Sequence, residues 1–262
     1  MGNDSIKKVL TVSFALCIFC SVLVSGAAIV LKEQQDLNKK MDIKRNLLIS
    51  SGVISSEVKD KKIILEAYKN VQELAVDLKT GNVLDNFDIE KLDTRKSAKT
   101  PGQNIELSSS QDLAKIKTVS KIVKVYLVKS SSGKIDKIVL PIHGKGLWST
   151  LYGFLALAPD TKTIKGLGFY EHGETPGLGG EVDNPRWKKL WEDKVAVNNE
   201  YQPQIVIVKG QVDHNSPANI NKVDGLSGAT ITSNGVQALI NFWVSENGYG
   251  PFLSQFRKGE VL

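Results

Sequence analysis

Asp-Gly-Leu-Ser-Gly-Ala-Thr-Ile-Thr, residues 224–232, is the most informative stretch of this chain. Its two glycines allow a flexible loop, and the hydroxyls of Ser227, Thr230 and Thr232 stand directly before an apolar pattern with helical spacing. The free amides and the positive dipole end of such a helix favour a bound phosphate. The residues alone are equally consistent with a glycine-rich turn that ends in a Ser/Thr helix cap.

A second glycine-rich stretch, Glu-His-Gly-Glu-Thr-Pro-Gly-Leu-Gly, occupies residues 171–179. Thr175 precedes Pro176 and is biased to an extended backbone, and the glycines allow the chain to approach a flat ring closely. A long surface turn is the competing interpretation. Upstream, Trp148 in Gly-Lys-Gly-Leu-Trp-Ser offers its flat face either to an aromatic ligand or to the protein core.

Taken together, the two motifs resemble the FMN-binding domain in which flavin is attached covalently, through its phosphate, to a threonine. The resemblance covers about residues 121–246. In that family the acceptor is the last residue of Ser/Thr-Gly-Ala-Thr, which is Thr230 here. The resemblance implies FMN held by a phosphoester at Thr230, installed by a separate flavin transferase that uses FAD, with no catalytic residue in this chain. The other implied flavin-binding residues are Ser227, Gly228 and Ala229 of the acceptor motif, Thr232 just after it, and Thr175, Leu178, Glu174 and Trp148 near the isoalloxazine ring.

The layout of the whole chain is similar to that of the C subunits of sodium-translocating NADH:quinone reductases. The G subunits of Rnf complexes share the flavin motif but tend to have a shorter extension, so residues 85–120 favour the reductase. The resemblance implies a membrane-anchored electron-transfer subunit of a sodium-pumping NADH:ubiquinone oxidoreductase, with the other subunits as partners. Two interpretations remain beside it: a non-catalytic exported scaffold that binds an anion at residues 228–233, and an independent extracellular flavoprotein reductase.

An uncharged stretch at residues 9–31 predicts a membrane anchor. As a helix it spans about 34 Å, enough for a bilayer core of about 30 Å. Lys7 and Lys8 precede it, which predicts a single span of a bacterial inner membrane with a cytoplasmic N-terminus and a periplasmic flavin domain. The alternative is a signal peptide cleaved near Ser25-Gly26-Ala27, but the apolar run is longer than such a core and continues past that site.

The remaining composition argues against other ligands. The net charge is only +6 and the lysines are scattered, so nucleic acid is not an expected partner. The three histidines, of which His172 lies in the second motif, show no metal-ligand spacing, and no metal site is predicted. Cys17 and Cys20 fall inside the apolar stretch and are interpreted as small apolar side chains; a metal shared with a partner's thiolates is the weaker alternative.

Two hairpins are predicted at residues 121–142 and 151–170, where β-rich runs flank Ser-Ser-Ser-Gly and Pro159-Asp160. Helices are expected at 185–191 and from Thr232 or Ser233, as N-cap, to about Val244, with a strand at 204–208. Together these elements predict an α+β fold with a mostly antiparallel sheet and packed helices.

The part before this domain is expected to contain an amphipathic helix that continues from the membrane to residue 51, a second helix at 61–71 and a hairpin that turns at Thr80-Gly81-Asn82. Charge-rich residues 85–120 are taken as the boundary of the main domain. The predicted organisation is a cytoplasmic N-terminus (1–8), a transmembrane helix (9–31), an extracytoplasmic extension (32–119) and an FMN-binding domain (120–262).

Overall fold

The computed structural model describes residues 5–261. The chain divides into two compact units, one ending at Ile43 and one beginning at Lys44. Helix α1 (Ile6–Ser50) is continuous, which confirms that the amphipathic stretch extends the apolar one. Its most apolar window has a mean hydropathy of 2.6 and is not buried, so by length and composition α1 is able to cross a membrane.

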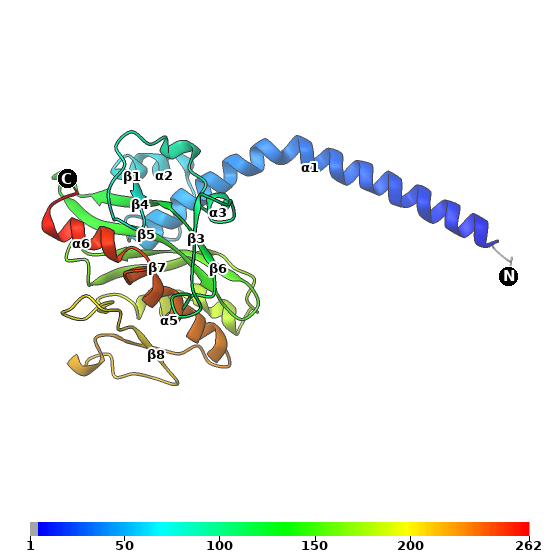
Figure 1. Cartoon of the computed structure of the whole chain (residues 1–262). Helices are drawn as coiled ribbons and strands as arrows, with labels where there is room; N and C mark the ends of the chain where they lie inside the picture. The colour runs from blue at the N-terminus through cyan, green and yellow to red at the C-terminus, as the bar shows by residue number, and fades with distance from the viewer. Residues whose placement is uncertain (1–4, 262) are drawn as a thin grey trace. The chain divides into compact units, whose positions relative to one another are not determined.

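Five antiparallel strands form the central sheet of the second unit, in the order β1-β4-β5-β6-β7 (Figure 1). The two predicted hairpins are confirmed as β4–β5 and β6–β7, and the α+β fold with them. The outer strand β1 precedes residue 120 in the sequence, yet it pairs along its whole length with β4. The strands are β1 (Val71–Asp77), β4 (Ile122–Lys129), β5 (Ile135–Lys145), β6 (Thr150–Leu157) and β7 (Ile164–Glu171).

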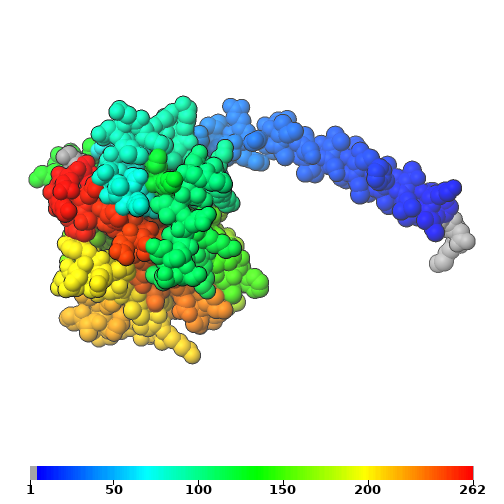
Figure 2. Space-filling view, in the orientation of Figure 1, coloured from blue at the N-terminus to red at the C-terminus, as the bar shows by residue number. Residues whose placement is uncertain are grey.

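The segment 85–120 is ordered and lies on the surface of this unit, in teal and green in Figure 2. It contacts the sheet directly, since the amide of Lys145 donates to the carbonyl of Ala114 at 2.8 Å. The expected hairpin at residues 80–82 turns as predicted, but Val76 and Val83 form only a single bridge. The elements here are α2 (Lys61–Tyr68), η1 (Ile89–Lys91), α3 (Thr94–Ser97), β2 (Asn104–Glu106) and β3 (Thr118–Ser120).

Beyond the sheet, shorter elements lead to the C-terminal helices. The strands β8 and β9 pair in parallel, and the 204–208 prediction is confirmed by the shorter β8. The predicted helix at 185–191 is α4, with Pro185 in its first turn. These elements are η2 (Gly179–Asp183), α4 (Pro185–Lys189), β8 (Val206–Val208), η3 (Pro217–Asn219), β9 (Lys222–Asp224), α5 (Thr230–Val244) and α6 (Gly250–Lys258).

Helix α5 lies close against β5 because glycines remove side chains from the contact. A Cβ on Gly235 would lie 2.4 Å from the carbonyl oxygen of Lys145, and one on Gly144 would lie 2.4 Å from Cβ of Leu239. The helix begins at Thr230 with Ala229 as its N-cap, so the prediction of Thr232 or Ser233 as the cap is wrong. The close packing therefore holds the first turn of α5, with its hydroxyls, against the end of the sheet.

Candidate functional site

The carboxylate of Glu174 joins three separate segments of the chain. It accepts hydrogen bonds from the amides of Leu147, Trp148 and Ser149 at 3.2, 3.0 and 3.0 Å. The hydroxyl of Thr232, in the first turn of α5, donates to its Oε2 at 2.7 Å. Glu174 is only 5% exposed. The two sequence motifs and the Gly-Leu-Trp-Ser segment thus meet at one buried charge.

These donors favour the ionised form of the Glu174 carboxyl group. Burial by itself raises the pKa of its carboxyl group, but the hydrogen bonds from Thr232, Ser149, Trp148 and Leu147 outweigh it and hold the pKa below the usual value. A buried carboxylate is costly without hydrogen-bond donors, so it favours the backbone conformation in which these donors point at it.

The hydroxyls of the acceptor motif and of the following start of α5 have different environments. Thr232 is fully buried and bonded to Glu174, and the hydroxyl oxygen of Ser233 accepts from the amide of Leu226 at 3.0 Å. Ser227 and Thr230 are exposed. Among the residues that the structure describes, the Thr230 hydroxyl has no hydrogen-bond partner. No side chain within residues 5–261 caps α5, so its first amides are also open to a ligand.

Exposed apolar side chains occur in the same segments. Trp148 is 68% exposed and Leu178 is 44% exposed. Leu178 lies beside the acceptor loop, since a Cβ on Gly228 would come within 3.0 Å of its Cδ2. Gly228 itself has a φ of +70°, a conformation that favours glycine. Trp148 does not belong to the core, which leaves its indole face free for a ligand, as one of the two sequence interpretations requires.

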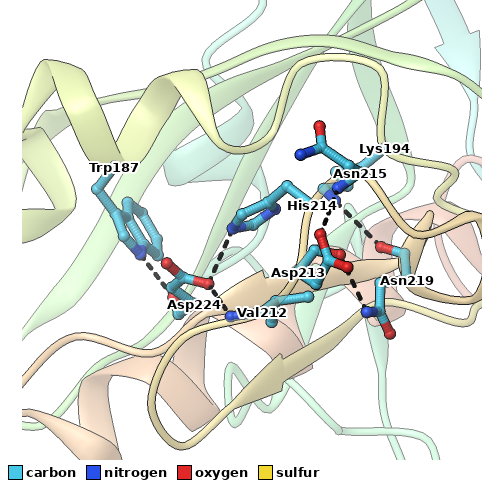
Figure 3. A network of polar contacts seen from close by, with 8 residues as sticks. All are labelled: Trp187, Lys194, Val212, Asp213, His214, Asn215, Asn219 and Asp224. Atoms are coloured by element: carbon cyan, nitrogen blue, oxygen red, sulfur yellow. Dashed lines mark hydrogen bonds and ion pairs between the residues drawn. The ribbon is translucent and has the colours of Figure 1, made fainter.

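Asp224, the first residue of the acceptor motif, anchors the loop before it (Figure 3). Its carboxylate oxygen Oδ1 accepts from the amide of Val212 at 2.8 Å and lies 2.9 Å from Nε2 of His214. Its carbonyl oxygen accepts from the indole Nε1 of Trp187 at 2.8 Å. Lys194, 6% exposed, donates to the carbonyl of Asn219 at 3.0 Å in the same loop. The start of the motif is therefore structural, and its exposed part begins at Ser227.

The comparisons with known proteins agree with this geometry. The family model of the FMN-binding domain matches residues 146–245, which contain all three segments that meet at Glu174. The chain is 42% identical over 260 residues to the C subunit of the Na(+)-translocating NADH-quinone reductase of Yersinia pestis, covering 99% of this chain and 96% of that one. It is also 42% identical to the corresponding protein of Pseudomonas aeruginosa, covering 99% of both chains.

The chain belongs to the NqrC family, the C subunits of Na(+)-translocating NADH-quinone reductases. The crystal structure of Shewanella oneidensis NqrC is similar, with a TM-score of 0.76 and 36% identity over 84% of this chain and 99% of that one. The corresponding protein of Parabacteroides distasonis matches with a TM-score of 0.64 and 26% identity, over 86% and 97% of the two chains. The prediction of this family, in preference to the Rnf G subunits, is confirmed.

Most of the predicted site residues lie together in this member of the NqrC family. Glu174, Thr232, Leu178 and Gly228 are linked by the contacts above, and Trp148 joins them through its amide. Thr175 is exposed, and its carbonyl accepts from the amide of Gly180 at 2.9 Å. Which of these residues touch flavin stays a prediction.

Sequence reasoning missed Arg95 of α3. Its guanidinium donates to both oxygens of Glu171 at 2.9 Å and lies 3.5 Å from the ring centroid of Tyr152. Glu171 is the last residue of β7, where the second motif begins, so Arg95 ties segment 85–120 to that motif. The partners lie far apart in the sequence, and no local pattern signals such a pair.

Proposed function

We propose that the chain carries FMN covalently, as a phosphoester on Thr230. In the attachment reaction, the Thr230 oxygen forms a bond to the flavin-side phosphorus of FAD, the pyrophosphate P–O bond breaks, and AMP leaves. The hydroxyl proton passes to a base on the separate flavin transferase. A hydroxyl must be exposed and unbonded to enter another protein's active site, and Thr230 meets both conditions while Thr232 meets neither.

The residues present fit this cofactor. The uncapped start of α5 offers backbone amides and a positive dipole end to a phosphate. The backbone of Ser227, Gly228 and Ala229 would bring the chain close to the phosphate, while Thr175, Leu178 and Trp148 would contact the isoalloxazine ring. The chemistry that FMN supplies is electron transfer, and the protein's part is placement and tuning. The difference in burial between Thr230 and Thr232 is the observation that carries this proposal.

At the level of the complex, we infer an electron-transfer role within a sodium-pumping NADH:ubiquinone oxidoreductase. The names of the relatives support it, as does the apolar helix α1, which precedes the FMN-binding domain and is by length and composition able to cross a membrane. Its partners would be the other subunits, the flavin transferase and the lipid bilayer. Lys7 and Lys8 support a cytoplasmic N-terminus and a periplasmic flavin domain in a bacterial inner membrane.

The test is in-gel flavin fluorescence of the denatured full chain, produced together with a flavin transferase. We expect a fluorescent band in the wild type and none in Thr230→Val, which keeps the size of the side chain but removes the hydroxyl. Ser227→Ala is the matched control, because it removes the other exposed hydroxyl of the same loop and should retain the band. A fluorescent Thr230→Val band would show that Thr230 is not the attachment residue.

A further inference from the structure

Glu174 was expected beside the flavin, but its carboxylate is already occupied by the protein. Its Oε1 receives the amides of Trp148 and Ser149 and lies 3.4 Å from the Ser149 hydroxyl. Its Oε2 receives the amide of Leu147 and the hydroxyl of Thr232. A carboxylate has about four acceptor positions, so these donors leave it no capacity for a ligand.

Two glycines next to Glu174 leave room for its carboxylate. A Cβ on Gly146 would lie 2.6 Å from Oε1, and a Cβ on Gly179 would lie 2.8 Å from Oε2 and 2.6 Å from the hydroxyl of Thr232. Side chains at these two positions would displace the carboxylate or its partners. The Ser149 hydroxyl also accepts from the amide of Gly173 at 2.7 Å, which holds the chain next to Glu174 from the other side.

We propose that Glu174 is a positioning residue, whose carboxylate assembles the three flavin-facing segments before FMN arrives. By drawing three consecutive amides inward it fixes the backbone that projects Trp148 outward, and by bonding Thr232 it fixes the first turn of α5 beneath Thr230. This proposal rests on the attachment of FMN to Thr230. It assigns Glu174 no direct contact with the flavin.

Hydrogen exchange followed by mass spectrometry tests the assembly without flavin. The full chain in detergent, produced without transferase, is compared as wild type, Glu174→Gln, Thr232→Val and Thr232→Ser. In Glu174→Gln, one acceptor oxygen becomes an amide NH₂ group that faces the hydrogen-bond donors of the protein. Thr232→Val removes the hydroxyl that bonds Glu174 to α5, whereas Thr232→Ser keeps it. We expect faster exchange in residues 146–149 and 171–180 for the Gln and Val variants, and wild-type exchange for Ser.

The same four proteins are then incubated with FAD and flavin transferase, and the rate of attachment is followed by in-gel fluorescence. We expect about a tenfold or larger loss of rate in Glu174→Gln and Thr232→Val, because misplacement of a reacting group by about 1 Å has effects of this size, and rescue in Thr232→Ser. Wild-type rates in the first two variants, or unchanged exchange, would overturn the positioning role. A wild-type chain that takes up no flavin would instead overturn the proposed function.

Discussion

Replacing Gly179 with alanine tests the packing around the buried carboxylate. The new Cβ would lie 2.6 Å from the Thr232 hydroxyl, 2.8 Å from Oε2 of Glu174 and 3.1 Å from its Cβ. The structure must therefore shift, at a cost of about 1–3 kcal/mol for overpacking. Loss of the hydroxyl–carboxylate hydrogen bond contributes about 1.5–3 kcal/mol more where it breaks completely. Since the two costs partly replace each other, we expect a destabilisation of about 2–4 kcal/mol.

Gly177→Ala is the matched control in the same loop. Gly177 has a φ of +75° and open space where a Cβ would stand, so alanine there meets no atom of the described residues within 4 Å. Its expected cost is backbone strain of about 1 kcal/mol. For a domain of this size each kcal/mol lowers Tm by about 2–4 °C. Thermal unfolding of the full chain in detergent should thus give decreases of about 4–16 °C for Gly179→Ala and about 2–4 °C for Gly177→Ala.

The comparison of the two alanine variants is the decisive result. Equal decreases in Tm, or a larger one for Gly177→Ala, would refute the argument that Gly179 is required for the Glu174–Thr232 contact. The flavin attachment rate should separate the variants in the same direction, because only Gly179→Ala displaces a residue of the first turn of α5.

Two other predictions concern acid stability and orientation. Burial, with the charge of a nearby arginine, lowers the pKa of His143 from 6.5 to about 4. The unfolded chain therefore binds the proton first as pH falls, and the folded chain should lose about 2 kcal/mol of stability from this residue between pH 7 and 5. Urea unfolding at both pH values should show this loss in the wild type and its absence in His143→Gln. For orientation, Ser132→Cys in an exposed turn, with Cys17→Ala and Cys20→Ala, should react with a membrane-impermeant maleimide in spheroplasts; labelling only after lysis would contradict a periplasmic domain.

The sequence predicted the local parts of the fold well. Both hairpins carry their own signals, since Asp160 accepts from the amides of Lys162 and Thr163 and so closes its turn with neighbouring residues. The pairing of β1 with β4 depends instead on residues such as Leu74 and Val125, which lie far apart in the sequence and are neighbours only in the folded chain. No periodicity within either strand specifies such a partner.

The candidate site divides in the same way. The glycine-rich motifs identified the segments, because turns and exposed hydroxyls are coded locally. The hydrogen bonds of Glu174 could not be predicted from the sequence. Their donors, the amides of residues 147–149 and the hydroxyl of Thr232, lie far from Glu174 along the chain. Any glutamate in a polar loop is expected to be solvated, and only the assembled structure shows that this one is buried.

The spacing of Thr230 and Thr232 gives these two hydroxyls opposite environments. Residues two apart on an α-helix point about 200° apart around its axis, so one faces inward when the other faces solvent. Because α5 begins at Thr230, both lie in its first turn, and the inward hydroxyl is Thr232, bonded to Glu174. The same hydrogen bond that connects the two motifs therefore orients the helix so that Thr230 is exposed. If α5 began one residue earlier or later, Thr232 would no longer face Glu174 and Thr230 would no longer face solvent. The packing of the helix therefore determines which hydroxyl is exposed, and that hydroxyl belongs to the residue that we propose to carry the flavin.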